Sequence, residues 1–487
     1  MTSKIGRVLF PLYVAALLLY SQTWAATGDE GFHMLAAQLI KRGMRPWIDF
    51  CFPQAPLNAW WNAGWMRVFG ETWRASHGVS ALLIAGAVFL TARFVQTRLP
   101  DDGWRWPVAL AAGLMTGLNV MVVEYGPLGQ AYGTGLLLSV AAFRLTVSAA
   151  ERPGVRHAAA AGLCAGAAGG CTLLTAPAGP VLALWLVFQS GAKQRWSKLV
   201  AMCGAALVPW LPVAWLAAQG PRQAWFNLVE YHTRWRPLYW PDTTQHDLET
   251  IALWVDSGQA VVIGLLALAG LAHVYFRSEW PRGLKAEFYL CAWMSLGLSI
   301  EAARAHPTFQ RYFVFIVPFV AILAAAGVYA MASRLLSPAR AWLPVAGLAF
   351  VFIFGLGKSL YDRQDIYTWL DYEHVAHRID QITPPGAPLF AEEHVYFLTR
   401  RQPPPGLEFT YSHKLTLPPA ELKLLHVIPQ AELDRQITDA KFATVYICED
   451  EDTYKKLRLH ENYELSEESE DCMLFWNRRH PPGVANQ

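Results

Sequence analysis

Long apolar stretches recur through the first three quarters of the chain, and they constrain its fold more than any other feature. Of the 487 residues, 54% are hydrophobic and only 16% are charged, whereas soluble domains carry roughly 25% charged residues. A helix that crosses a bilayer needs about 20 mainly apolar residues. We therefore expect an α-helical polytopic membrane domain with about eleven transmembrane helices. The expected spans lie near residues 8–24, 76–95, 107–123, 130–148, 157–174, 177–190, 199–218, 256–276, 286–302, 312–332 and 341–358.

The charged residues divide the chain into two unlike parts. Residues 1–358 hold 27 Lys and Arg against 16 Asp and Glu, and residues 359–487 hold 13 against 22. In the second part, PLFAEEH (388–394) and ATVYICE (443–449) are typical of short strands, and AELDRQITDA (431–440) is typical of a helix. We thus expect a multi-span membrane domain over 1–358, followed by a small outer α/β domain over 359–487.

Basic residues set the expected orientation in the membrane. Lys4 and Arg7 precede the first span, and every second connection is again basic, so we expect the N-terminus and these connections in the cytoplasm. With an odd number of spans, residues 359–487 and the long loops 25–75 and 219–255 then face outward.

Two alternatives would change the number of spans. Residues 157–190 could form a re-entrant pair rather than two spans. Residues 8–24 could be a cleaved signal sequence, because SQTWAA offers small residues to a peptidase. The count of spans would then be even, and the following loop would lose its anchor.

Basic and cysteine residues limit the possible partners. Lys and Arg do not cluster at the density that phosphate tracking needs, so no nucleic acid is expected. No CxxC or Cys/His spacing indicates structural zinc. Cys448 and Cys472 flank the acidic stretch of the C-terminal part, and we interpret the run EDEDTYKK (449–456) as a solvated loop. The two cysteines could pair in an oxidising compartment, or both could be free thiols.

The first expected outer loop contains the strongest candidates for chemistry. Asp29 and Glu30 are adjacent acids among apolar residues near the expected membrane boundary, which indicates a functional site. Residues 30–43 have helical spacing and could lie in the membrane plane. Alternatively, Asp29 caps this helix and Glu30 lies in its first turn. Asp49, in the same loop, is a candidate for substrate binding, and the aromatics around it suit a membrane-interface belt.

Two further groups stand at expected outer ends of spans. Glu124 begins EYGPLGQAYG, and Glu124 and Tyr125 could line one cavity. The alternative is a plain turn with a solvated acid. Arg304, His306 and Arg311 share the loop EAARAHPTFQRYF. Arginine can bind two phosphate oxygens at once, so this loop is our candidate for a phosphate site. Contact with lipid headgroups is the alternative.

Other motifs are less specific. The loop NLVEYHTRWRPLYWPDTTQHD (227–247) could form either a surface that binds a sugar or a helix on the membrane surface. His246 beside Asp247 is a weak metal signal, because a single pair lacks the further ligands that a metal site needs.

The order of these motifs resembles a known superfamily. An apolar span is followed by DEG, by KRGMRPWIDF, by PQAPL with aromatics, and by a second span. Together with GGCTLLTAPAGPVLALW (169–185) and HPTFQRYFVFIVPFVAILAAAGV (306–328), this order is similar to the GT-C membrane glycosyltransferases. It resembles in particular bacterial relatives of protein O-mannosyltransferases and of the aminoarabinose transferase that modifies lipid A (families 39 and 83). His77 and Thr175-Ala176-Pro177 depart from the pattern, where relatives often have Arg and Lys.

The resemblance implies an integral protein of a bacterial inner membrane with a GT-C-like fold. It implies transfer of a sugar from a polyprenyl-phosphate donor to a lipid, glycan or protein acceptor at the outer face. Asp29 would be the general base and Glu30 would orient the acceptor. No cofactor is indicated, although related enzymes differ in their use of a divalent metal. The partners would be the donor, the acceptor and membrane lipids.

Two other classes of function remain open. A transporter or flippase of lipid-linked sugars would also contain intramembrane charges and broken helices. Against it, the second half of the chain does not repeat the first, and the charges gather at the expected outer ends. A non-catalytic assembly scaffold would tolerate the loss of the outer acids.

Overall fold

A computed structural model describes residues 2–239, 242–277, 280–469 and 471–479. The chain divides into two compact units. The first unit comprises residues 1–25, 77–214 and 240–366, and the second comprises residues 26–76, 215–239 and 367–487. The second unit therefore combines the C-terminal segment with two segments from the earlier part of the chain. The sequence boundary between residues 358 and 359 stays a prediction.

Helices occur at all eleven of the expected spans. Within the described residues, six segments are long and apolar enough to cross a membrane: Trp73–Arg98, Tyr132–Glu151, Arg195–Gln219, Gly258–Phe276, Gln310–Leu335 and Pro338–Asp362. The polytopic helical fold is thus confirmed, while the number of spans stays a prediction. The helices at the expected spans are α1 (Thr2–Thr23), α4 (Trp73–Arg98), α5 (Arg105–Gly117), α6 (Val120–Tyr125), α7 (Tyr132–Glu151), α8 (Arg156–Cys171), α9 (Ala178–Gln189), α10 (Arg195–Leu207), α11 (Leu211–Gln219), α14 (Gly258–Phe276), α15 (Arg282–Arg304), α16 (Val317–Leu335) and α17 (Trp342–Asp362).

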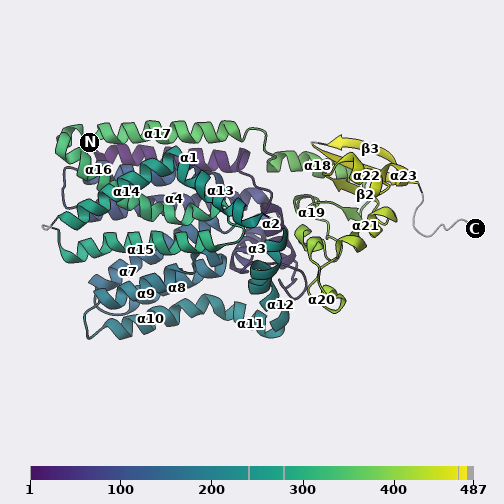
Figure 1. Cartoon of the computed structure of the whole chain (residues 1–487), viewed down its shortest axis with the longest axis horizontal. Helices are drawn as coiled ribbons and strands as arrows, with labels where there is room; N and C mark the ends of the chain where they lie inside the picture. The colour runs from purple at the N-terminus through teal and green to yellow at the C-terminus, as the bar shows by residue number, and fades with distance from the viewer. Residues whose placement is uncertain (1, 240–241, 278–279, 470, 480–487) are drawn as a thin grey trace, which may run out of the picture. The chain divides into compact units, whose positions relative to one another are not determined.

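The core of the first unit lies around α16. Most of this helix is buried, and α14 and α15 pack against it while α17 runs alongside α14 (Figure 1). A short helix, α13 (Thr243–Asp256), precedes α14, and a 3-10 turn, η5 (Gln310–Ile316), leads into α16. Of the candidate phosphate-binding residues, Arg304 ends α15, His306 lies in the loop between α15 and η5, and Arg311 belongs to η5.

Small residues allow α8 and α10 to approach closely. A Cβ on Gly162 would lie 1.9 Å from the Met202 carbonyl oxygen, and one on Gly166 would lie 2.0 Å from the Ala206 carbonyl oxygen. No side chain fits at either distance, so the backbones touch there. The Gly- and Ala-rich composition of α8 is therefore explained by helix packing.

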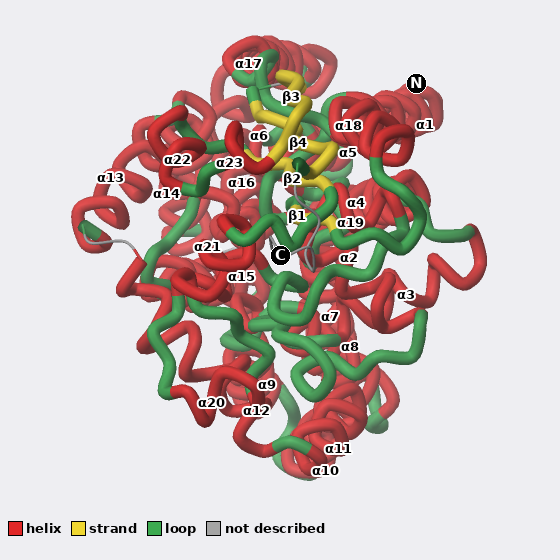
Figure 2. Tube along the Cα trace, turned by 90° about the vertical axis from the view of Figure 1, so that its right-hand side faces the viewer, coloured by secondary structure: helices red, strands yellow, loops and turns green. Residues whose placement is uncertain are grey.

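The second unit contains a four-stranded sheet with the order β1-β2-β4-β3 (Figure 2). β1 and β2 are parallel, and the pairs β2–β4 and β4–β3 are antiparallel. The expected small α/β domain is confirmed. Its strands are β1 (Leu389–Phe390), β2 (Thr444–Ile447), β3 (Tyr463–Ser469) and β4 (Cys472–Arg478). The α-helices of the second unit are α2 (Glu30–Lys41), α3 (Leu57–Phe69), α12 (Pro221–Trp225), α18 (Trp369–Ile382), α19 (Glu393–Thr399), α20 (Pro419–Leu424), α21 (Gln430–Thr438), α22 (Glu451–Lys456) and α23 (Leu459–Asn462). The unit also contains the π-helix η3 (Phe226–Trp235), the turn η4 (Arg236–Tyr239) and the 3-10 turn η7 (Thr410–Lys414).

Three local predictions in the second unit were wrong or incomplete. The strand expected over 388–394 covers only Leu389–Phe390, because α19 begins at Glu393. The expected loop 449–456 is mostly the helix α22, whose N-cap residue Asp450 accepts a hydrogen bond from the Thr453 amide at 2.8 Å. The sequence analysis also missed β3 and β4.

Cys448 and Cys472 form a disulfide. The register of β2 and β4 pairs Ile447 with Met473, so the next residue along β2 faces the first residue of β4. The strand register thus shows that Cys448 and Cys472 are paired rather than free thiols, a choice that the sequence left open.

We predict that replacing both Cys448 and Cys472 by Ser lowers the free energy of unfolding by about 3 kcal/mol, because the bond closes a loop of 24 residues and restricts the unfolded chain. Denaturant unfolding of the purified protein in detergent measures this. Cys203→Ser is the matched control, since Cys203 is an exposed free thiol. Equal stability of the double variant and the control would contradict the prediction.

Candidate functional site

Asp29 stands directly before α2, in a turn closed by a hydrogen bond from the Glu30 amide to the Thr27 carbonyl at 3.0 Å. It occupies the N-cap position, but its side chain makes no capping hydrogen bond. The carboxylate is half-buried. The capping alternative is therefore wrong for the Asp29 side chain, although the expected helix is present as α2.

Glu30 begins α2 and is fully buried. Its Oε2 accepts a hydrogen bond from Trp369 Nε1 at 2.9 Å. The Trp369 ring stacks on Trp73, with 5.8 Å between centroids. Because a buried carboxylate is costly without hydrogen-bond donors, this indole fixes Glu30 in place. The sequence could not have indicated Trp369, which is 339 residues away.

Asp49 is held by Arg45. Its carboxylate accepts hydrogen bonds from the Arg45 backbone amide at 2.7 Å and from two guanidinium nitrogens at 3.0 and 2.8 Å. These bonds lower the pKa of Asp49. Its expected role in substrate binding stays a prediction. The nearby aromatics Trp47, Phe50 and Phe52 are buried in the protein, so the expectation that they form a membrane-interface belt was wrong.

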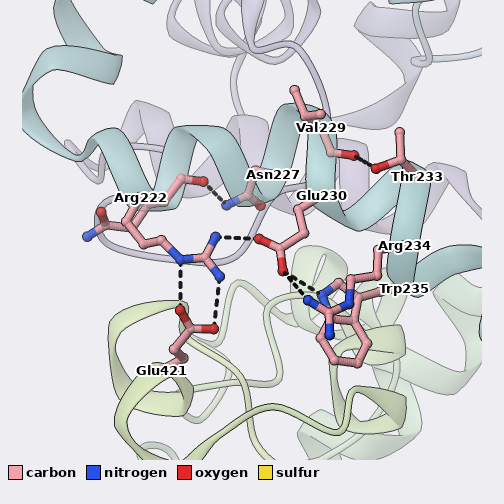
Figure 3. A network of polar contacts seen from close by, with 9 residues as sticks. Arg222, Asn227, Val229, Glu230, Thr233, Arg234, Trp235 and Glu421 are labelled. Atoms are coloured by element: carbon pink, nitrogen blue, oxygen red, sulfur yellow. Dashed lines mark hydrogen bonds and ion pairs between the residues drawn. The ribbon is translucent and has the colours of Figure 1, made fainter.

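The segment 215–239 is fixed within the second unit by charge pairs (Figure 3). Arg222 donates to both carboxylate oxygens of Glu421, at 2.7 and 2.8 Å, and to Glu230 at 2.6 Å. Trp235 also donates to Glu230, at 3.1 Å. In the same π-helix, burial lowers the pKa of His232 to about 4, so its ring is neutral at pH 7. These contacts hold residues 222–235 against Glu421 of α20.

Glu124 lies in the first unit, at the end of α6, and is buried. It forms an ion pair with Arg363 at 2.5 Å and accepts a hydrogen bond from the Ser359 hydroxyl. The alternative of a solvated acid was therefore wrong.

Tyr125 belongs to the same group of charges. The Arg363 guanidinium carbon lies 5.5 Å from the centre of its ring, and the charges of Arg363 and Arg311 both act on its hydroxyl. The expectation that Glu124 and Tyr125 line one cavity stays a prediction. Their role in substrate binding stays a prediction.

The loop after α15 is organised by Asp247 of α13. One carboxylate oxygen contacts His306 Nδ1, and the other accepts a hydrogen bond from the Thr308 amide at 2.6 Å. His246 Nε2 lies 3.1 Å from the Thr308 carbonyl oxygen. The His246–Asp247 pair therefore holds this loop, and within the described residues no group of acids, histidines and cysteines could hold a metal ion.

The two arginines on either side of this loop differ in their surroundings. Arg304 is the last residue of α15 and is exposed. Arg311 is half-buried, and its guanidinium lies 4.4 Å from the centre of the Phe309 ring. His77, which departs from the expected Arg, is buried, and its Nδ1 lies 2.6 Å from the Ser21 carbonyl oxygen.

We predict that Arg363→Ala lowers the free energy of unfolding by about 3–5 kcal/mol, because it leaves the buried Glu124 carboxylate without its partner. The double variant Glu124→Gln/Arg363→Met recovers most of this loss, since neither charge then remains. Unfolding in detergent by denaturant measures both. As a control, Arg458→Ala breaks a pair whose side chains are 59% and 62% exposed, and this costs at most about 1 kcal/mol. Equal losses in Arg363→Ala and Arg458→Ala would contradict the prediction.

Comparison with known proteins shows the fold. No protein-family model and no curated protein sequence matches the chain. A crystal structure of ArnT from Cupriavidus metallidurans bound to undecaprenyl phosphate is similar over 96% of this chain and 97% of that chain, with 14% identity and a TM-score of 0.69. The apo structure of ArnT is similar over 98% of both chains, with 15% identity and a TM-score of 0.67. The expected fold class, a polytopic helical membrane domain with a small α/β domain, is confirmed, and the protein is an integral membrane protein.

Proposed function

We propose that the protein transfers a sugar from a polyprenyl-phosphate donor to a lipid, glycan or protein acceptor at the outer face of the membrane. The observation that carries this proposal is the difference in burial and hydrogen bonding between the two acids at the start of α2. Glu30 is buried and held by Trp369, whereas Asp29 is half-buried and its carboxylate is not used for capping. The GT-C-like fold supports it, and ArnT, which has this fold, binds undecaprenyl phosphate in one of its structures.

The proposed reaction assigns Asp29 as the general base. Its carboxylate takes the proton from the acceptor hydroxyl or amine. The acceptor oxygen or nitrogen then bonds to the anomeric carbon of the sugar, and the bond from that carbon to the phosphate oxygen breaks. The polyprenyl phosphate leaves with the bonding electrons. Glu30 keeps the start of α2 in position during this step.

The leaving phosphate gains negative charge, which a guanidinium can bind through two oxygens. We propose Arg311 and Arg304 for this contact. His306 supports the loop through its contact with Asp247. Glu124 neutralises Arg363, so we do not assign Arg363 to the donor phosphate.

The proposed orientation places the N-terminus in the cytoplasm of a bacterial cell and the C-terminal domain outside it. The basic connections between spans favour this arrangement. The disulfide between Cys448 and Cys472 also favours it, because such bonds persist in oxidising compartments.

We predict that Asp29→Asn lowers sugar transfer by at least about 100-fold, because the amide cannot accept the proton. The protein is reconstituted in vesicles with a radiolabelled polyprenyl-phosphate sugar and membrane lipids, and labelled acceptor is counted. Asp439→Asn is the control: it makes the same change of charge at an exposed residue that ends α21. If the unaltered protein and Asp29→Asn carry labelled donor across the vesicle membrane equally well and neither labels an acceptor, the protein is a transporter and the proposal fails.

We predict that Arg311→Ala raises the KM for the donor by about 10- to 100-fold, since a hydrogen bond to a charged group contributes about 1.5–3 kcal/mol. The same assay at varied donor concentration measures this. Arg340→Ala removes an exposed arginine from a turn between two spans and serves as the control. An unchanged KM in Arg311→Ala would exclude this residue from the donor site.

A further inference from the structure

A pocket of about 450 Å³ lies in the first unit, where the chain turns from α4 into α5. None of its lining residues belongs to the candidate sites described above. Five of the six lining side chains are polar or charged, and the sixth is a tryptophan that is 38% exposed. Two arginines against one aspartate give the pocket a positive charge. The lining residues are Arg93, Gln96, Thr97, Asp102, Arg105 and Trp106.

The pocket lies at the end of the first unit that carries the N-terminus. A Cβ on Gly6 of α1 would lie 3.6 Å from the Trp106 ring, and a Cβ on Gly103 would lie 3.0 Å from Pro338, in the turn before α17. Figure 1 shows the N-terminus beside the start of α17. Because α4 and Pro338–Asp362 are both long and apolar enough to cross a membrane, the pocket stands at a membrane boundary. In the proposed orientation this is the cytoplasmic boundary.

Arg93 brings an unneutralised positive charge to the pocket. Its guanidinium contacts the side-chain oxygen of Gln96, and no carboxylate pairs with it in the described part of the chain. Arg98, five residues later, differs because it is paired with Glu151 and Glu287. The Gln96 amide nitrogen donates to no acceptor among the described residues, so both lining side chains have hydrogens available for a ligand.

Arg105 is held at the pocket by the loop between α4 and α5. Its Nε donates to the Leu99 carbonyl at 2.7 Å, and its Nη2 donates to the Pro100 carbonyl at 3.4 Å. Its Nη1 contacts the Asp102 carboxylate, whose side chain is 83% exposed. An ion pair so open to water is weak. Asp102 can therefore give way to another anion while the backbone keeps the guanidinium in place.

The chemistry of the lining fits a phosphate group. A guanidinium can bind two phosphate oxygens at once, and the Gln96 amide can donate to a third. The volume falls within the range of small-molecule sites, about 300–1,000 Å³, and so exceeds what a bare ion needs. Basic pockets at the cytoplasmic end of membrane helices suit anionic lipid headgroups, and exposed tryptophans suit the headgroup region.

We propose that this pocket binds the phosphate of an anionic phospholipid headgroup through Arg93 and Arg105, with the Trp106 ring beside the lipid. A lipid bound there links the ends of α4 and α5 to the start of α1, which Trp106 already contacts. The inference goes beyond the proposed function, because the pocket needs neither the sugar donor nor the acceptor.

The test uses the full chain in nanodiscs of three kinds. The first contain phosphatidylcholine alone, the second also contain phosphatidylglycerol, and the third contain phosphatidylcholine with glycerol 3-phosphate in solution. Hydrogen exchange of peptides that cover residues 93–106 reports on the pocket. In parallel, native mass spectrometry of the protein in detergent, titrated with phosphatidylglycerol, gives the Kd of the first bound lipid.

The variants are Arg93→Gln, Arg105→Gln and Asp102→Asn. Arg340→Gln is the matched control, because Arg340 is an exposed arginine in the turn before α17, at the same end of the first unit, and does not line the pocket. All of these side chains lie at least partly in solvent, so the fold is retained, and exchange in the remaining peptides checks this.

We expect phosphatidylglycerol to slow exchange over residues 93–106 and glycerol 3-phosphate to leave it unchanged. Arg93→Gln and Arg105→Gln each raise the Kd by about 10-fold, because each removes a hydrogen bond to a charged group. Asp102→Asn lowers the Kd by about 2- to 5-fold, since it removes a weak competitor for Arg105. Arg340→Gln stays within about 2-fold of the unaltered protein, because salt screens exposed charges outside the pocket.

Equal exchange in nanodiscs with and without phosphatidylglycerol would overturn the inference. Equal losses of affinity in Arg93→Gln and Arg340→Gln would also overturn it, because binding would then follow surface charge alone, and so would equal or weaker binding in Asp102→Asn. Slower exchange with glycerol 3-phosphate but not with phosphatidylglycerol would identify a soluble phosphate as the ligand and exclude the lipid. Neither measurement uses sugar transfer, so this inference and the proposed function can fail separately.

Discussion

The buried carboxylate of Glu30 is the contact on which the candidate site depends. It lies at the first turn of α2, and its hydrogen-bond donor is the Trp369 indole, which is fully buried with it. Leaving this carboxylate without a donor would cost several kcal/mol, so α2 and α18 are fixed together. Trp73 and His394 then pack on Trp369, and Gly31 leaves room for the imidazole. Asp29 is the residue directly before this packed turn.

Other charged side chains in apolar surroundings also have a hydrogen-bond or ion-pair partner. Arg98 binds Glu287 at 2.8 Å and Glu151 at 2.7 Å, and so joins three helices of the first unit. Lys198 is 2% exposed and donates to the Ala149 carbonyl at 2.6 Å, near the end of α7. Pairing of this kind is what a membrane protein requires of charges in apolar surroundings. Glu30 and Glu124 are both held by contacts of this kind.

The sequence indicated the helices well, because they are encoded locally, whereas the roles of the candidate acids stay predictions. Apolar length predicted the spans, and helical spacing predicted α2. Trp369, His394 and Arg363 were missed, because they meet their partners only through the fold: Arg363 is 239 residues from Glu124. β3 was missed because four of its seven residues are exposed and three are acidic. The pairing of Cys448 with Cys472 was open in the sequence and follows from the register of β2 and β4.

The most direct test of Asp29 as the general base is a cryo-electron microscopy structure of the protein with a non-reactive analogue of a polyprenyl-phosphate sugar. We predict that the phosphate contacts Arg311. The Asp29 carboxylate should face the side of the anomeric carbon opposite the phosphate, with space between them for one acceptor group at hydrogen-bond distance, about 3 Å. An analogue bound with its sugar turned away from Asp29, or with its phosphate on other cations, would contradict the proposed mechanism.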